Sequence, residues 1–309
     1  MTRHKPHGAA LILAILVVAL ASTIAVFMVG QQSQWTQQAG NLAARAQTNA
    51  FAHAAIDWAR GVLAEDARNS KVDHLGEAWA NRLPSLPVES ATISGAIYDQ
   101  QALFNLNNLV RNGRDSEADI ALFKRLLAQL QLPTELVNSL LDWIDADSDV
   151  HFPGGAEDAD YLLSAQPYRS ANQALVSVDE LYRVRGFNPT QIQRLKPFVT
   201  ALPQRTTINI NTAPREVLLA LLPDLAETAI STVLENRKSA FFKSQQDFRS
   251  RLPQAVPALR DEFYDVTSSF FLAEVNVRSS RADSTYAALL VRTANGGWPG
   301  IVWQRQLAE

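Results

Sequence analysis

The first 30 residues contain the feature that most constrains this chain. Residues 1–8 include two basic side chains, Arg3 and Lys5, and an uncharged apolar run from Ala9 to Val29 follows them. The 21 residues of that run are long enough to cross a bilayer as a helix, because each residue adds about 1.5 Å of rise. The next charged residue is Arg45, so positive charge lies only on the N-terminal side of the run. We therefore expect a single-pass membrane protein with a cytoplasmic N-terminus.

Three kinds of N-terminal segment are consistent with this pattern. A secretory signal peptide is disfavoured, because the run is too long and no Ala-x-Ala cleavage site follows it. A plain membrane anchor remains open. So does a prepilin-type leader, in which the cut follows a glycine just before the apolar run and the helix is retained. Gly8 followed by Ala9 fits that placement.

The helix is expected to continue beyond the membrane. Between Trp35 and Leu63 there is no proline. Apolar side chains recur there at spacings of three and four: Phe51, Ala54, Ala55, Trp58, Val62 and Leu63. Such a stripe is typical of a helix that packs one face on a globular domain.

The remaining sequence predicts strands at both ends and helices between them. Residues 91–98 alternate weakly and predict a strand, and residues 266–277, 285–293 and 301–306 predict three more. The last two are joined by a turn at residues 294–297. Caps such as Ser177 with Glu180, and Thr212 before Pro214, mark helices between them.

We therefore expect an α+β fold, in which a long N-terminal helix packs on a small antiparallel sheet that carries a large inserted all-helical domain. The expected boundaries are a leader (1–8), a transmembrane half-helix (9–29), the outer half-helix with the first strand (30–98), the helical insertion (99–258, with a helix-hairpin-helix-like segment at about 206–250) and the C-terminal sheet (259–309).

A loop in the predicted helical insertion is dense in acidic residues. It contains Asp142, Asp145, Asp147, Asp149, Glu157, Asp158 and Asp160. Carboxylate oxygens on a glycine-containing loop are ligands that Ca²⁺ prefers. Asp145, Asp147 and Asp149 match the first three ligand positions of an EF-hand, but Val150 replaces its glycine and Ala156 its bidentate glutamate. The loop is therefore another kind of calcium site or a solvated acidic loop. His151 is a poor Ca²⁺ ligand and receives no role.

Composition and motifs favour no enzyme class. The absence of cysteine excludes disulfides and thiol chemistry, and a formal net charge of −3 provides no global basic field for nucleic acid. The signatures of serine hydrolases, zinc proteases, dinucleotide-binding proteins and P-loop NTPases are missing. We expect neither an enzyme nor a small-molecule binding protein.

With these segments placed, the chain resembles the minor pseudopilin K family of type II secretion systems over nearly its whole length. The resemblance is carried by Gly8-Ala9-Ala10-Leu11-Ile12-Leu13, by Phe104-Asn105-Leu106-Asn107, by the acidic block at residues 142–158 and by Ile208-Asn209-Ile210-Asn211-Thr212-Ala213. It implies cleavage after Gly8 by the prepilin peptidase and N-methylation of Ala9. It also implies an inner-membrane protein whose C-terminal domain is periplasmic.

The same resemblance implies the partners and the metal. The expected partners are the minor pseudopilins I and J and other pseudopilins, at the tip of a pseudopilus that exports folded proteins. Leu13 stands at the fifth mature position, where most pilins carry a glutamate, and this fits a tip subunit. The implied calcium ligands are Asp145, Asp147, Glu157 and Asp158, with Asp149 and Asp160 as further candidates.

One alternative function remains. Residues 208–248 also resemble a helix-hairpin-helix module, which in a membrane-anchored competence-like protein would bind DNA. Here the hairpin reads Leu222-Pro223-Asp224-Leu225, and Asp224 would oppose a phosphate. A packing role for this module is therefore preferred, and no nucleic-acid partner is expected.

Overall fold

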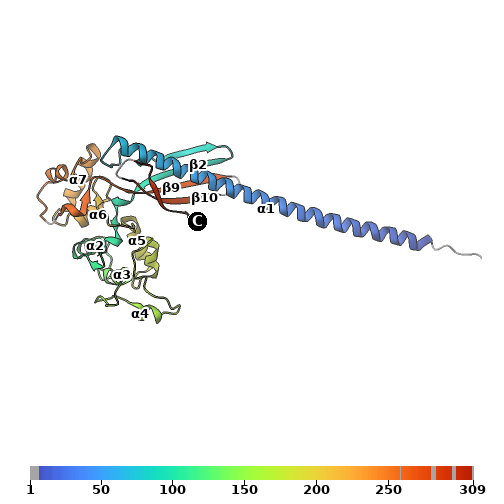
Figure 1. The fold of residues 1–309 in the computed structure, drawn as a ribbon, viewed down its shortest axis with the longest axis horizontal. Coiled ribbons are helices and arrows are strands. Elements are labelled where there is room, and N and C mark those ends of the chain that lie inside the picture. The colour runs from blue at the N-terminus through green and yellow to red at the C-terminus, as the bar shows by residue number, and fades with distance from the viewer. Residues whose placement is uncertain (1–6, 258, 280–282, 294–296, 308–309) are drawn as a thin grey trace, which may run out of the picture.

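A computed structural model describes residues 7–257, 259–279, 283–293 and 297–307 of the chain. Its dominant element is α1 (His7–Asn69), an unbroken helix of 63 residues. Figure 1 shows its N-terminal half projecting alone from a globular part made of a sheet and a helical region. The predicted continuous helix is therefore confirmed. Residues 1–6 of the expected leader lie outside the described residues.

The outer half of α1 packs on the sheet through a face that is shifted from the one the sequence predicted. Ala52, Ile56, Ala59 and Leu63 are buried, whereas Trp58 is 53% exposed. The predicted stripe was therefore wrong at Ala54 and Trp58, which are exposed, and is confirmed at Phe51, Ala55, Val62 and Leu63. Small alanines at this face let the helix lie close to the strands, and the bulky indole is turned outward instead.

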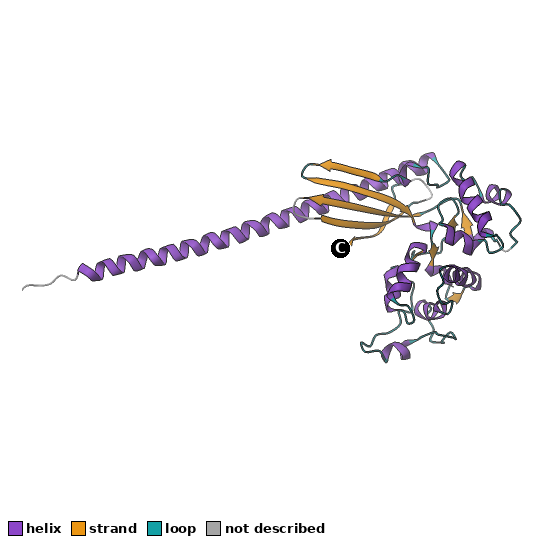
Figure 2. Ribbon diagram, turned by 180° about the vertical axis from the view of Figure 1, so that it is seen from behind, coloured by secondary structure: helices purple, strands orange, loops and turns teal. Residues whose placement is uncertain are grey.

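Five antiparallel strands form the sheet that α1 covers (Figure 2). In spatial order they are β1 (Leu83–Val88), β2 (Ala91–Asp99), β9 (Phe270–Ser279), β10 (Asp283–Val291) and β11 (Gly300–Leu307). The four predicted strands are confirmed, and β2 pairs directly with β9, with Ile97 opposite Ala273. Residues 294–296 of the predicted turn lie outside the described residues.

The sequence reading missed β1. Its six residues include Pro84 and Pro87, and its side chains are mostly exposed. A proline cannot donate a hydrogen bond to a neighbouring strand, so it is tolerated only at a sheet edge, and β1 is an edge strand.

The region inserted between β2 and β9 is mainly helical. Its helices are α2 (Glu117–Gln129), α3 (Leu136–Ile144), α4 (Asp158–Leu162), α5 (Pro189–Leu195), α6 (Arg215–Leu221), α7 (Glu227–Ser239) and α8 (Gln245–Ser250). Short 3₁₀ segments are η2 (Gln100–Ala102), η3 (Leu106–Leu109), η4 (Val178–Arg183), η5 (Lys196–Phe198) and η6 (Asp261–Phe263), while η1 (Ala78–Ala80) lies between α1 and β1.

The insertion also contains strands that the sequence did not predict. They form three pairs: β3 (Phe104–Asn105) with β6 (Val199–Thr200), β4 (Val110–Arg111) with β5 (Arg114–Asp115), and β7 (Ile208–Asn209) with β8 (Tyr264–Asp265). Two-residue strands leave no alternation in the sequence, so periodicity cannot reveal them.

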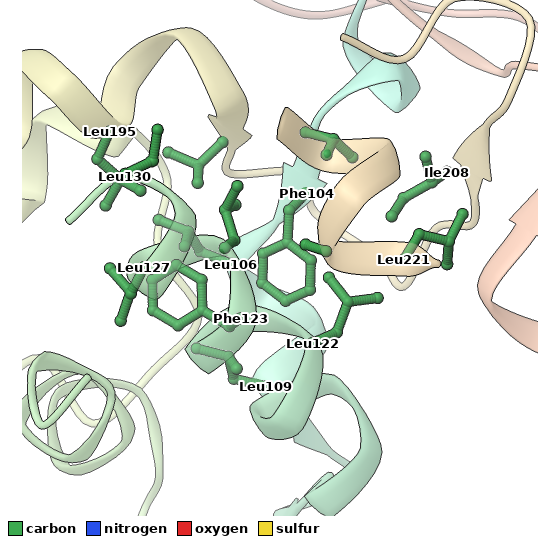
Figure 3. Packing of buried hydrophobic residues seen from close by; sticks show 14 of the residues in the cluster. Phe104, Leu106, Leu109, Leu122, Phe123, Leu127, Leu130, Leu195, Ile208 and Leu221 are labelled. Atoms are coloured by element: carbon green, nitrogen blue, oxygen red, sulfur yellow. The ribbon is translucent and has the colours of Figure 1, made fainter. Parts of the chain in front are cut away.

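Among the described residues, buried hydrophobic side chains form two large cores and a small cluster of Leu202, Phe270 and Leu289. One lies between α1 and the sheet, where Trp79 meets Phe271 edge to face with ring centroids 5.2 Å apart. The other fills the helical region and is shown in Figure 3, where Phe104 and Phe123 stack at 5.3 Å among leucines of several elements.

Two local predictions about caps had different outcomes. Ser177 and Glu180 form the expected capping box, although the segment they open is the 3₁₀ helix η4. The prediction that Thr212 caps the next helix was wrong, because Pro214 occupies the N-cap position of α6. The Thr212 hydroxyl instead donates a hydrogen bond to Asp99, 2.6 Å away.

Candidate metal site

The acidic loop runs from the end of α3 to α4, in the part of the helical region that lies away from the sheet in Figure 1. Asp145 is the C-cap residue of α3, and Glu157 is the N-cap residue of α4. The intervening residues fold back, so two carboxylates twelve positions apart meet at the helix ends.

Three of the predicted metal ligands come together there. Asp145, Asp147 and Glu157 each offer a carboxylate oxygen, and these oxygens lie within 4.8 Å of one another. Asp145 is 5% exposed and Glu157 is 4% exposed. Both carboxylate oxygens of Asp145, and Oε1 of Glu157, are buried without a hydrogen-bond partner among the described residues. The His151 ring lies beside the group, with its Nδ1 3.9 Å from Oδ2 of Asp145, beyond hydrogen-bond distance. Buried carboxylates without hydrogen bonds are unfavourable, so the group still lacks positive charge.

The electrostatics of the group lead to the same conclusion. Burial, together with the charges of Asp147 and Glu157, raises the pKa of Asp145 to about 7. Burial and the charge of Asp142 raise the pKa of the Glu157 carboxyl above its usual range. A cation between the three groups would relieve both the mutual repulsion and the loss of hydration.

The geometry fits calcium. Ca²⁺ takes oxygen ligands at about 2.3–2.6 Å, which places ligand oxygens up to roughly 5 Å apart across the ion. The separations within the group match that limit. An all-carboxylate set also suits a hard cation better than Zn²⁺, which prefers nitrogen and sulfur ligands.

The other three candidate ligands have different neighbours. Asp158 accepts hydrogen bonds from the backbone N–H and the hydroxyl of Ser170, at 3.0 and 2.9 Å. Asp160 forms an ion pair with Arg185 and accepts a 3.3 Å hydrogen bond from the Glu157 N–H. Asp149 is exposed, and its N–H donates to Asp147 at 2.9 Å. These residues shape the loop around the three converging carboxylates.

His151, to which the sequence assigned no role, ties the loop to its surroundings. Its Nδ1 lies 2.5 Å from Oδ1 of Asp142, and its Nε2 lies 2.8 Å from Oδ2 of Asp115. Burial acts against protonation, but these two hydrogen-bonded carboxylates raise the pKa of His151 overall. The loop is thus held to both α3 and β5. Sequence spacing gave no signal for this, because Asp115 lies far from the acidic block.

Gly155 occupies a position in the acidic loop where only glycine fits. A Cβ atom built there would lie 2.3 Å from Oδ2 of Asp142 and 2.3 Å from the His151 carbonyl oxygen. Since no side chain fits at those distances, only glycine lets the loop pass over the end of α3.

A second carboxylate group has a different character. Asp66, Asp73 and Glu77 also lie close together. There, however, the guanidinium of Arg292 pairs with Asp66 at 2.7 Å and with Asp73 at 2.5 Å. The cation that this group needs is therefore supplied by the chain itself.

The residues of the expected processing site lie at the start of α1. Gly8, Ala9 and Leu13 all fall within the helix. The apolar part of α1 has a mean hydropathy of 2.9 over its best 18-residue window, and none of that window is buried in the protein. Within the part of the chain that the structure describes, α1 is long enough and apolar enough to span a membrane, as a single-pass anchor requires.

Comparison with known proteins shows the family to which the chain belongs. Two family models, both described as type II secretion system (T2SS), protein K, match residues 102–204 and 208–266. The type II secretion system protein K of Pseudomonas aeruginosa is 32% identical, over 97% of this chain and 92% of that protein. The chain belongs to the type II secretion system protein K family. The protein K of Aeromonas hydrophila is also 32% identical, over 95% of this chain and 98% of its own length.

A solved structure of a protein K supports the same fold. The crystal structure of the GspK-GspI-GspJ complex from the enterotoxigenic Escherichia coli type 2 secretion system contains a chain that matches with a TM-score of 0.74 at 27% identity. The match covers 85% of this chain and 96% of that one. The long helix, the antiparallel sheet and the helical insertion predicted from the sequence are therefore features of the protein K fold.

Proposed function

We propose that this protein K is a minor pseudopilin at the tip of the type II secretion pseudopilus, where it initiates assembly with the minor pseudopilins I and J. The observation that carries the proposal is α1 itself: an apolar half exposed on all sides continues into a half that packs on a sheet. A related protein K solved in a GspK-GspI-GspJ complex supports the choice of partners.

The helical region supports the position at the tip. It lies at the end of the molecule away from the exposed half of α1 (Figures 1 and 2). A subunit added beyond it along the pseudopilus axis would meet this bulk. Leu13 adds a second reason, since it provides no carboxylate to pair with the N-terminal amine of a neighbouring subunit inside the membrane.

The same proposal covers processing and location. The prepilin peptidase cuts after Gly8, Ala9 becomes the methylated N-terminus, and α1 remains in the inner membrane with the globular part in the periplasm. The basic residues Arg3 and Lys5 on one side of the apolar run support this orientation.

Calcium is the metal proposed for the acidic loop, held by Asp145, Asp147 and Glu157. The ion would join the end of α3 to the start of α4, and so fix a loop that repulsion among these carboxylates otherwise opens. Its role is structural, because two of the ligands, Asp145 and Glu157, are buried and all three belong to one local segment.

The test is co-purification. The full chain would be produced in membranes with its I and J minor pseudopilins, and detergent-solubilised complexes isolated through a tag on this chain. We expect a stable complex containing all three proteins, and a loss of that complex for Leu42→Asp, since Leu42 is 71% exposed on the outer half of α1. Leu86→Asp, the same change at an exposed leucine of the edge strand β1, is the matched control. Isolation of a folded chain free of both partners would contradict the proposal.

A further inference from the structure

A cleft of about 600 Å³ lies where the sheet meets the helical region. Its sheet wall is formed by Ala96 and Tyr98 of β2 and by Leu272 and Glu274 of β9. Side chains alternate along a strand, and the intervening Ile97 and Ala273 belong to the core beneath α1. Ile97 and Trp79 of that core also line the cleft, so it reaches from the face of the sheet opposite α1 to the 3₁₀ segment η1.

The walls of the cleft are mainly apolar and come from both parts of the fold. They include Leu75, Ala80, Ala96, Tyr98, Leu103, Pro197, Pro214 and Leu272. Leu75 is 57% exposed and Tyr98 is 38% exposed, so this surface is open to solvent. Clefts of this size and composition, at a junction between structural units, are typical binding sites.

One acidic side chain in this cleft lacks a partner. Glu274 is half-buried, and among the described residues no hydrogen bond or ion pair engages its carboxylate. Burial raises the pKa of Glu274, and the charge of Arg82 at the rim acts in the opposite direction from a distance. The buried carboxylates of Asp73 and Asp119, by contrast, are directly paired with Arg292 and Arg111.

We propose that this cleft binds an extended segment of a protein partner that carries a lysine or arginine between apolar residues. The partner's cation pairs with Glu274, and its flanking side chains cover the leucine, tyrosine and proline walls. Charge complementarity supports this occupant, because a half-buried carboxylate in apolar surroundings favours an incoming cation over solvent. The inference is independent of the tip position, since it depends only on the sheet and its junction with the helical region.

Binding of designed peptides to the full chain in detergent, at pH 8 to keep Glu274 ionised, tests the proposal. The probe is a labelled Ser-Leu-Lys-Leu-Ser peptide, and the comparison peptide has norleucine in place of lysine. We expect fluorescence anisotropy to show binding of the lysine peptide roughly tenfold tighter than binding of the norleucine peptide, as one charged hydrogen bond provides. Glu274→Gln should remove that difference and leave the norleucine peptide unaffected.

Arg82→Ala separates this role from a structural one. Removing the competing cation at the rim should tighten binding of the lysine peptide and leave the norleucine peptide unchanged. Arg278→Ala, which lies further along β9 in an exposed ion pair with Asp283, is the matched control and should change neither. The proposal is overturned if the folded chain does not bind the lysine peptide, or if it binds both peptides equally.

Discussion

At the scale of single residues, Asp145 provides the sharpest test of the calcium site. In Asp145→Asn, one buried charge is removed from a group whose members repel each other. We therefore expect the metal-free variant to melt no lower than the metal-free parent. The rise in Tm that calcium gives the parent should be lost, because a ligand stabilises only the state that binds it.

Scanning calorimetry of the full chain in detergent, in calcium and in chelator, would measure both effects. Asp149→Asn is the matched control, since Asp149 is exposed and contributes only its backbone N–H to Asp147. An identical Tm for the parent with and without calcium would remove the metal from the proposal.

A second residue-scale prediction concerns pH. Burial is the largest cause that raises the pKa of both Asp66 and Asp99 to about 6. An unfolded aspartate titrates near 3.9, so the folded chain binds protons more tightly, and stability falls as the pH rises through about 6. For the fully buried Asp99 the loss is of the order of 2–3 kcal/mol. Asp66 is less buried and lies beside Arg292, so its share is smaller.

Urea unfolding in saturating calcium, at pH 5 and pH 7.5, would show about half of this loss, because the rest occurs as the pH rises from about 4 to 5. Thr212, Ser268 and Gln101 donate hydrogen bonds to Asp99, and Asp73 is the charged group nearby. Asp57→Asn serves as the control. Asp57 is exposed on α1, so this substitution should not alter how stability depends on pH. A stability that does not change between the two pH values would show that these carboxyls remain ionised when buried.

The candidate metal site also shows what single residues reveal before a structure is known. The density of carboxylates between residues 142 and 160 left two predictions open, a calcium site and a solvated acidic loop. It could not separate Asp145, Asp147 and Glu157 from Asp158 and Asp160, because that depends on where the chain turns back. Asp115 and His151 were missed for the same reason, since their contact joins distant segments.

At the scale of elements, α1 provides a direct test of its corrected packing face. Leu63 is fully buried against the sheet, whereas Trp58 is 53% exposed. Leu63→Ala should therefore lower the free energy of unfolding by about 2–5 kcal/mol, as large-to-small core changes do. Trp58→Ala should change it by less than about 0.5 kcal/mol. Urea denaturation of both variants measures the difference, and a larger loss for Trp58→Ala would restore the original stripe.

The elements that sequence predicted best were those with long, regular patterns. The apolar run and its helical continuation gave α1, and alternation gave β2, β9, β10 and β11. The edge strand β1 was missed because its prolines are typical of loops, and the paired short strands were missed because two residues have no period. β2 and β9 pair although the long helical region separates them in the sequence, and only the tertiary structure shows this pairing.

At the scale of the whole molecule, a buried polar group joins the two parts of the fold. The Asn209 side chain, in the helical region, donates hydrogen bonds to the Asp73 carbonyl, to Asp99 and to Ser268. These partners come from the segment after α1, from the end of β2 and from the approach to β9. The sheet is thus tied to the helical region by directional hydrogen bonds.

The last prediction concerns the whole chain as it enters the membrane. Co-expression with a prepilin peptidase should remove the eight residues Met1 to Gly8 and add one methyl group to Ala9. Gly8→Phe should leave the leader in place, because a bulky side chain would occupy the position where the peptidase meets a glycine. Gly30→Ala is the matched control, since a Cβ at Gly30 meets nothing within 4 Å. Intact-mass spectrometry distinguishes the outcomes: a retained leader in the parent would indicate a plain anchor, and a cut beyond Val29 would indicate a signal peptide.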